Sequence, residues 1–291
     1  MHPVLIAAVN RLKLVPVWMT PFFRVTAPRT PTRRLREFIE PFLAGGVPVY
    51  VQLMGTDAAA MGAAARDFMT LGASGINLNF GCPSKQVMRH GSGGGWLRDV
   101  PALLTLVRGV ADAAPDAPLS VKLRSGFDRC DSAWYSDLRE AGASLVFMHF
   151  RTVAEGYREL PFETALERFS NAAAVLKDVP LIANGDIDSP LRRDECLAAG
   201  CAGVMAGRAW LRDPGLLCRL SGMDGGAVDR RCELFQTVVE LAKNDGGFRF
   251  FNGRAIELSV MLWGGGNPVL ELLKNASDGA WRAIDVLKIM K

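Results

Sequence analysis

The feature that most constrains the fold is an alternation of short apolar runs with longer amphipathic stretches. The apolar runs are strand-like and cover residues 15–19, 47–55, 75–80, 119–124, 144–149, 180–185 and 202–208. The stretches between them have helical character and cover residues 32–43, 57–71, 100–113, 131–141, 165–177 and 190–199. Strands that are short apolar runs and alternate with helices are typical of a parallel sheet covered by helices.

Polar residues or glycines end nearly every apolar run. They are Gln52, Cys82, Lys122 with Arg124, His149, Asn184 with Gly185, and Gly207 with Arg208. A (β/α)8 TIM barrel builds its site from side chains at the carboxyl ends of its strands, so this pattern favours a barrel. A doubly wound open sheet is the alternative, but no GxGxxG turn follows the first run.

Seven runs are found where a closed barrel requires eight. Residues 2–14 have apolar positions at helical spacing, including Val4, Leu5, Ala8 and Val9. The chain therefore starts with a helix where a barrel starts with a strand. We expect the first strand to be missing, through truncation or a start codon assigned too late. The alternative is that Met1 is authentic and the barrel is open at that seam.

The alternation ends after Asp213-Pro214. Amphipathic helices are expected at about 232–243, 253–263 and 280–289, separated by glycine-rich breaks. This predicts a barrel domain over residues 1–213, a linker over 214–228 and a small helical domain over 229–291.

Composition excludes several classes of protein. No run approaches the roughly 18–20 apolar residues of a membrane span, and the start lacks the features of a signal peptide. The six cysteines form no CxxC pair and there are three histidines, so no metal site is expected. Such cysteine usage is typical of a cytoplasmic protein with reduced thiols. The net charge of +4 permits a polyanionic partner.

The run at 75–80 carries two unexplained amides, Asn77 and Asn79, and leads into Cys82, which stands between a glycine and a proline. A buried amide without a partner costs a few kcal/mol, so these asparagines either pair with backbone or face a bound molecule. Buried cysteines are commonly small hydrophobic residues. A cysteine in this turn has no packing role, which favours a reactive thiol.

The other strand ends suggest a ligand. Taken alone, Lys122 would be interpreted as a solvated cation and His149 as a structural histidine. Gly185 together with Gly207-Arg208, in the last two loops, fits a phosphate cradle, and Gln52 offers an amide for a ring edge. A phosphorylated flat cofactor such as FMN fits this set, with Cys82 facing it as a proton donor.

The segment Asn79-Phe80-Gly81-Cys82-Pro83-Ser84-Lys85, followed by Gly91-Ser92-Gly93-Gly94-Gly95, resembles the signature of tRNA-dihydrouridine synthases. The resemblance continues through residues 51–55, 121–124, 148–152, 183–186 and 207–208, and the glycine run is most similar to the bacterial C-type branch. It implies FMN-dependent reduction of specific tRNA uridines to 5,6-dihydrouridine, with NADPH as reductant. Hydride would go to C6 of the uracil, and Cys82 would protonate C5.

The resemblance also implies roles for individual residues. The flavin-contacting positions would be Gln52, Lys122, His149, Asn184, Gly185, Asp186, Gly207 and Arg208. Asn79 and Arg151 match positions near the base, and the helical domain would help to hold tRNA. Arg33 and Arg34 belong to a cluster with Arg24, Arg29 and Arg36 that we expect to contact tRNA. We expect a monomer.

The chain departs from the family pattern in three places. The Ala-Pro-Met-x-Gly motif of the family's first strand is absent, Phe150 stands where the family usually has glycine, and the stretch after Tyr157 lacks the usual Ala-Asp-Trp. Two other functions remain open: a flavin-barrel dehydrogenase of a small pyrimidine, and a truncated paralogue that binds RNA without turnover.

Overall fold

The computed structural model describes residues 2–223, 229–244 and 251–275. The chain divides into two compact units, one formed by Val17–Gly207 and the other by Met1–Pro16 with Arg208–Lys291. Among the described residues, no helix is both long and apolar enough to cross a membrane.

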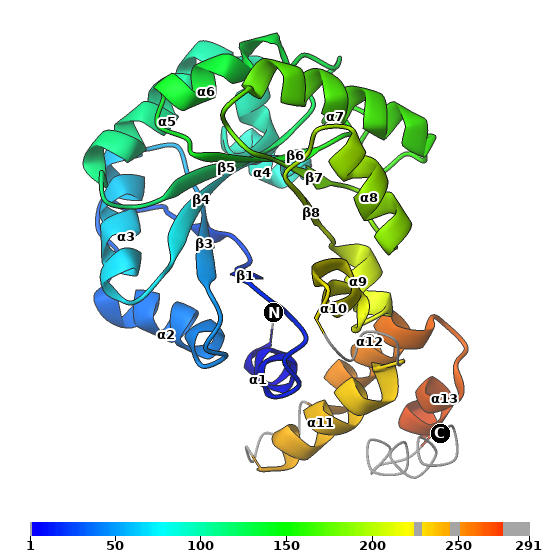
Figure 1. Ribbon diagram of the computed structural model, residues 1–291. Helices are drawn as coiled ribbons and strands as arrows, with labels where there is room; N and C mark the ends of the chain where they lie inside the picture. Colours follow the sequence, from blue (N-terminus) through cyan, green and yellow to red (C-terminus); the bar gives the residue numbers. More distant parts are fainter. Residues whose placement is uncertain (1, 224–228, 245–250, 276–291) are drawn as a thin grey trace. The chain divides into compact units, whose positions relative to one another are not determined.

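Val17–Gly207 contains a parallel sheet that curls with its helices on the outside (Figure 1). The sheet order is β1-β3-β4-β5-β6-β7-β8, with β2 also paired to β3. The strands are β1 Trp18–Met19, β2 Phe23–Arg24, β3 Val49–Met54, β4 Gly75–Phe80, β5 Leu119–Arg124, β6 Leu145–His149, β7 Leu181–Asn184 and β8 Gly203–Met205. All of these pairings are parallel, which confirms the predicted barrel architecture with seven strand positions.

β1 and β2 are two short pieces of one strand position. Trp18 pairs with Val49 and Phe23 with Leu53, so the register shifts by one residue between them. Pro21 lies in the interruption and has no N–H to donate. The Thr20 hydroxyl accepts the Gln52 N–H there at 3.1 Å. β1 and β8 are not paired with each other in the described part of the chain, so the sheet is open at this seam.

Helices follow the strands and cover the outer face of the sheet. They are α2 Thr32–Leu43, α3 Ala58–Thr70, α4 Lys85–Arg89, α5 Val100–Ala113, α6 Asp137–Glu140, α7 Phe162–Leu176 and α8 Pro190–Ala198, with the 3₁₀ helices η1 Gly93–Arg98 and η2 Ala133–Ser136. Their starts follow from sequence: the side chains of Asp57, Asp99 and Ser189 cap α3, α5 and α8.

Most predicted helices are confirmed, with one correction. The single helix expected over 131–141 is replaced by η2 and the one-turn helix α6. Tyr135, fully buried in this stretch, donates a hydrogen bond to the Arg124 carbonyl at 3.2 Å, so tertiary packing determines its conformation.

The other unit is helical. It contains α1 Pro3–Arg11, α9 Arg208–Arg212, α10 Leu216–Ser221, α11 Arg231–Asn244, α12 Phe251–Trp263 and α13 Pro268–Asn275. The predicted helix in residues 2–14 is α1, which packs on α11, where Arg11 pairs with Glu240 at 3.7 Å. α10 lies inside the stretch expected to be a linker, and α13 was not anticipated. The helix expected at 280–289 lies outside the described residues.

Candidate active site

The two asparagines of β4 belong to a chain of amide hydrogen bonds across the strand ends. Asn77 accepts from Gln52 Nε2 at 2.8 Å and donates to Ser120 Oγ at 3.0 Å. Asn79 donates to Gln52 Oε1 at 2.7 Å. Asn77 is fully buried, and these bonds satisfy the polar groups that its burial removes from water.

Asn79 also shapes the turn that carries the cysteine. Its Oδ1 accepts hydrogen bonds from the backbone N–H groups of Gly81 and Cys82, both at 3.1 Å. This is the local side-chain-to-backbone pattern that stabilises turns. Asn79 therefore pairs with backbone, as one of the two readings of these amides expects, whereas Asn77 pairs with the side chains of Gln52 and Ser120.

Two further contacts hold the carbonyl groups of the same turn. The Gly81 carbonyl accepts from Arg124 Nε at 2.9 Å, and the Cys82 carbonyl accepts from the Gly94 N–H at 2.9 Å. The N–H and C=O groups of both residues therefore have partners. The backbone presents the half-exposed Cys82 thiol in a fixed position.

The glycine run after the cysteine is explained by close packing. A Cβ at Gly94 would lie 2.8 Å from Val153 Cγ2 and 3.0 Å from the Cys82 carbonyl oxygen. A Cβ at Gly93 would lie 3.0 Å from Cys82 Cβ, and Gly93 has a φ of +60°. Any larger residue would push η1 away from Cys82.

Lys122 lies on β5, in register with Asn79 of β4. Burial of its ammonium group, followed by the like charge of Arg124, lowers the pKa of Lys122 to about 8, while interaction with Cys82 opposes the shift. Lys122 and Cys82 are therefore electrostatically coupled.

Arg124 joins the ends of three strands. It is almost fully buried and, besides the Gly81 carbonyl, its Nη1 donates to the carbonyls of Thr152 at 2.8 Å and Gly156 at 2.7 Å. Burial lowers the pKa of Arg124 from its usual value. The cation holds the cysteine turn against the loop after β6.

The ends of β6 and β7 form a second group. His149 and Asn184 are paired in register, and the Asn184 side chain donates to the Met205 carbonyl at 2.9 Å. His149 Nδ1 accepts the Arg151 N–H at 3.2 Å, which places the proton of the neutral ring on Nε2. Arg151 is buried and forms an ion pair with Asp186 at 2.5 Å.

Arg151 also carries an unsatisfied donor. Its Nη1 is buried and has no hydrogen-bond partner in the described part of the chain. A buried cationic donor without a partner is costly, and a bound acceptor would relieve that cost.

Phe150 is accommodated without displacing its neighbours. Its ring is fully buried, stacks on His149 with centroids 5.6 Å apart and lies beneath the Arg151 guanidinium at 4.4 Å. Gly185 leaves the required space, because a Cβ there would lie 2.7 Å from the ring. The glycine also has a φ of +112°, which other residues rarely adopt.

The structure thus brings most of the predicted strand-end residues together on β3 to β7. Gly207 ends the unit that contains the sheet, and a Cβ on it would meet no atom of the described residues within 4 Å. Arg208 begins α9 in the other unit.

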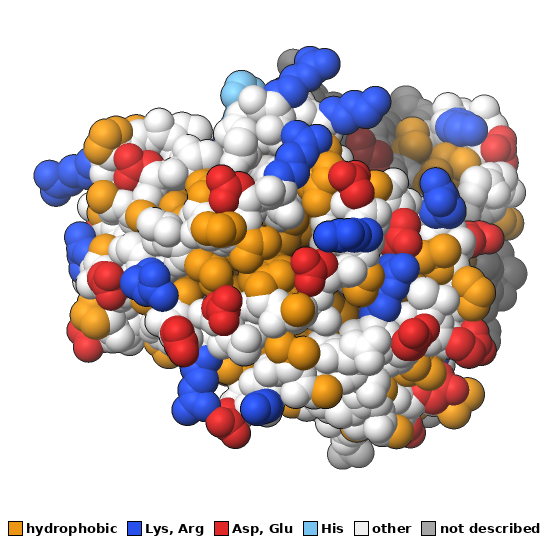
Figure 2. Space-filling view, turned by 90° about the horizontal axis from the view of Figure 1, so that it is seen from above, with side chains coloured by type: hydrophobic (Ala, Val, Ile, Leu, Met, Phe, Trp, Pro, Cys, Tyr) orange, Lys and Arg blue, Asp and Glu red, His pale blue; other side chains and the backbone are white. Residues whose placement is uncertain are grey.

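The arginines expected to contact tRNA lie on an exposed surface. Arg33 is on α2 and pairs with Glu37 at 2.7 Å, and the Arg34 guanidinium lies 5.4 Å from the Phe23 ring centroid. On the face seen in Figure 2, basic and acidic side chains are interspersed around apolar ones. Their contact with tRNA stays a prediction.

Sequence reasoning missed the supporting residues. The structural partners that it did not identify are Ser120, which bonds Asn77, Arg124, which bonds the Gly81 carbonyl, and the ion pair between Glu155 and Arg168 at 2.7 Å. Hydrogen bonding to Arg168 lowers the pKa of Glu155 to about 2, and Glu155 accepts the Thr152 N–H. The described residues contain no group of three or more His, Cys, Asp or Glu placed to hold a metal ion.

Comparison with known proteins identifies a family. The family model for dihydrouridine synthase matches residues 17–246. The tRNA-dihydrouridine(16) synthase of Cupriavidus necator is 38% identical over 73% of this chain and 68% of its own length. The corresponding protein of Ralstonia nicotianae is 36% identical over 69% of this chain and 63% of its own length.

Solved structures share the fold at low sequence identity. A variant of NCR from Zymomonas mobilis has a TM-score of 0.53 and 13% identity, covering 75% of this chain and 80% of its own. Morphinone reductase in complex with tetrahydroNAD has a TM-score of 0.52 and 12% identity, covering 76% and 81%. With the family match and the relatives, we conclude that the chain belongs to the dihydrouridine synthase family of flavin-dependent oxidoreductases.

Proposed function

We propose that this protein reduces specific uridines of tRNA to 5,6-dihydrouridine, with FMN as cofactor and NADPH as reductant. The observation that carries the proposal is the Cys82 turn, which Asn79, Arg124 and Gly94 hold from three sides. Position 16 is the first uridine to test, because relatives from Cupriavidus necator and Ralstonia nicotianae are named for it.

The residues present fit FMN. Among the described residues, Arg151 Nη1 is a buried donor without a partner, and no atom lies within 4 Å of a Cβ built on Gly207. Gln52, Lys122, His149, Asn184–Asp186 and Gly207 would hold the cofactor, and the family resemblance assigns Arg208 to its phosphate as well. Bound and reduced, the flavin would supply the hydride that uracil C6 accepts.

The chain's own residues supply the proton. Cys82 Sγ–H donates its proton to uracil C5, which completes the saturation of the C5–C6 bond, and the thiolate then regains a proton from solvent. The ammonium group of Lys122, which is coupled to Cys82, stabilises the transient thiolate. Asn79 and Arg124 act as positioning residues, because they hold the cysteine backbone.

Recognition of tRNA is assigned to three regions. Asn79 and Arg151 would lie close to the flipped base, since the target uridine must leave its stack to reach the strand ends. Arg33 and Arg34 would contact phosphates. The helical segment 229–291 would hold the body of the tRNA, supported by the separate helical unit that contains it.

The test is reduction of tRNA from a strain lacking dihydrouridine, with purified protein, FMN and NADPH, followed by mass spectrometry of nucleosides. Cys82→Ala is expected to lower turnover at least 100-fold, the lower end of the range for general acid catalysis. Cys196→Ala, which removes a buried thiol from α8, is the control and keeps its activity. Equal turnover in Cys82→Ala and wild type would show that the proton donor is misassigned.

A further inference from the structure

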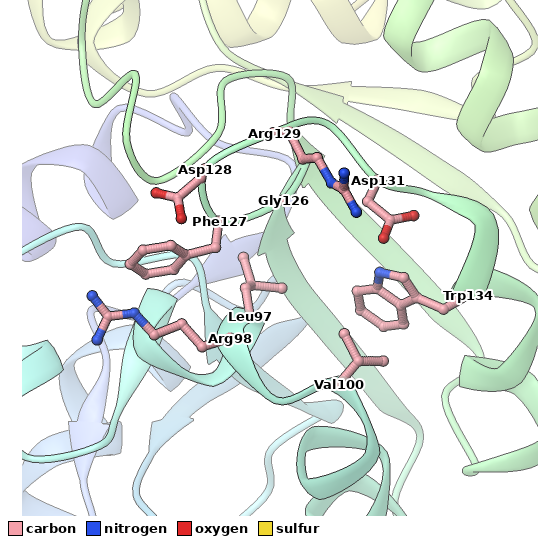
Figure 3. A pocket seen from close by; sticks show the side chains of 9 residues that line it. All are labelled: Leu97, Arg98, Val100, Gly126, Phe127, Asp128, Arg129, Asp131 and Trp134. Atoms are coloured by element: carbon pink, nitrogen blue, oxygen red, sulfur yellow. The ribbon is translucent and has the colours of Figure 1, made fainter.

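A pocket of about 460 Å³ opens between η1 and the loop after β5 (Figure 3). Its volume lies within the range of small-molecule sites, ~300–1,000 Å³. The residues that bear on its chemistry are Arg98, Phe127, Asp128, Arg129, Asp131 and Trp134. None of them has a role in the site described above.

Two aromatic rings come from different sides of this pocket. Figure 3 shows Phe127 with Arg98 on one side and Trp134 with Asp131 on the other. The Arg98 guanidinium lies 4.1 Å from the centroid of the Phe127 ring. Trp134 packs edge-on against the buried Tyr135, with centroids 4.8 Å apart. Both residues are half-buried, and the Arg98 guanidinium covers one face of the Phe127 ring.

Contacts within the protein fix the conformation of the loop that carries Phe127. Gly126 has a φ of +152°, and a Cβ on it would lie 2.0 Å from the Arg129 carbonyl oxygen, so this turn requires glycine. The carbonyls of Gly126 and Phe127 accept the N–H groups of Val153 and Ala154 at 3.0 and 2.9 Å. A preorganised loop binds at a lower entropic cost.

The charges indicate what the pocket takes. Arg98 and Arg129 are balanced by Asp128 and Asp131, so the lining has no net charge. Two carboxylates disfavour a pyrophosphate or a ribose phosphate, and hence the phosphorylated portions of a nicotinamide dinucleotide. Aromatic faces with both donors and acceptors fit a neutral heterocycle, as in proteins that stack single-stranded bases on aromatic and arginine side chains.

The pocket walls belong to the same segments that hold the cysteine. η1 contributes Arg98 at one end and, at the other, Gly94, which donates to the Cys82 carbonyl. The loop with Phe127 follows Arg124, which donates to the Gly81 carbonyl. If tRNA is the substrate, we expect the strand that delivers one base to Cys82 to reach this pocket, because η1 and the end of β5 contact the cysteine turn and lead directly into the pocket lining.

We propose that the pocket binds a second nucleobase of the tRNA, stacked on Phe127 and Trp134, while the target uridine lies at Cys82. An exocyclic amine on this base would donate to Asp131, and its ring acceptors would face Arg129. The inference rests on the proposed function, because it requires tRNA as the substrate.

The test measures the Kd of unmodified tRNA by filter binding for full-length Phe127→Leu and Trp134→Leu proteins. Each loss of a stacking ring is expected to raise the Kd about tenfold, and Trp134→Phe is expected to restore most of the affinity. The slope of log Kd against log salt stays unchanged, since phosphate contacts are not touched. Phe22→Leu, which removes an exposed ring outside the pocket, is the matched control.

Three outcomes would overturn the inference. Unchanged tRNA affinity in both leucine variants would exclude a base in this pocket. A slower reduction of the flavin by NADPH, with unchanged tRNA affinity, would assign the pocket to the dinucleotide. A wild-type protein that does not bind tRNA would remove both proposals. If wild-type protein binds tRNA but makes no dihydrouridine, only the proposed reaction fails. The Kd values of the variants then still show whether the pocket binds a base of the tRNA.

Discussion

Lys122 is half-buried and carries a charge that the protein has to accommodate. Its pKa falls to about 8 from an ordinary value of 10.5 because its ammonium group is desolvated and lies near Arg124. Between these two pH values the unfolded chain binds more protons than the folded one, so the unfolding free energy rises with pH. Below pH 8 the lysine is charged in both states, and the cost of burial is present in full.

We therefore predict that Lys122→Met is more stable than wild type at pH 7, by up to about 3 kcal/mol. The difference should shrink as pH rises from about 8 to 10.5, because the wild-type lysine loses its charge in the folded state. Urea unfolding at several pH values measures this difference. Lys177→Met, which removes an exposed lysine, is the control. A difference that is constant across this pH range would contradict the assignment.

The position of Cys82 at a strand end is predictable from sequence, because glycine and proline interrupt the apolar run. The hydrogen bonds that hold its backbone are not predictable in this way. The Gly81 carbonyl bonds to Arg124, 43 residues away, and no local pattern encodes that pairing. The same limit applies to Asn79, whose two partners on the turn are local while its third, Gln52, is 27 residues away.

At the scale of elements, long helices with side-chain caps are predictable, and short ones are not. α3 and α5 have the expected bounds within a residue, and each begins at a capping aspartate. β2, α4 and η1 were not anticipated, since each is a short segment in a region rich in glycine or proline. Their conformation depends on contacts with β3 and with the Cys82 turn.

The packing of η1 against the cysteine gives a prediction about adjacent glycines. Gly94→Ala places a Cβ 2.8 Å from Val153 and 3.0 Å from the Cys82 carbonyl, so η1 has to move away. We expect a loss of about 1–3 kcal/mol in stability, the usual cost of overpacking. Turnover should fall at least tenfold, because the cysteine is displaced from its working position.

Gly95→Ala is the matched control for this change. A Cβ on Gly95 would meet its nearest atoms at 3.6 Å, an ordinary contact distance. Its stability and turnover should remain close to those of wild type. Thermal unfolding and steady-state dihydrouridine formation measure the stability and turnover of both variants. Similar losses in the two variants would mean that the contact with Cys82 is not the reason why η1 fails to accept alanine.

At the scale of the molecule, the N-terminal segment packs with helices from the C-terminal part of the chain. α1 packs on α11, Arg230 donates to the Leu12 carbonyl at 3.5 Å, and Cys218 Sγ lies 3.8 Å from the Lys13 carbonyl. Periodicity predicts α1 as a helix but does not indicate its partner, because an amphipathic face fits several partners. The sequence predicts a barrel domain over residues 1–213, and the compact units group Met1–Pro16 with Arg208–Lys291.

This grouping predicts which part of the protein a core substitution in α1 destabilises. Val9 is fully buried in α1, and Val9→Ala should cost on the order of 2 kcal/mol in the unit that contains α1 and α11. Amide hydrogen exchange followed by mass spectrometry should therefore become faster in residues 231–244 and stay unchanged in β3 to β7, since these strands belong to the other compact unit. Val4→Ala, at a partly exposed position on the same helix, should leave both regions unaffected. Faster exchange in the strands, to the same extent as in α11, would mean that α1 stabilises the sheet as much as it stabilises the helices.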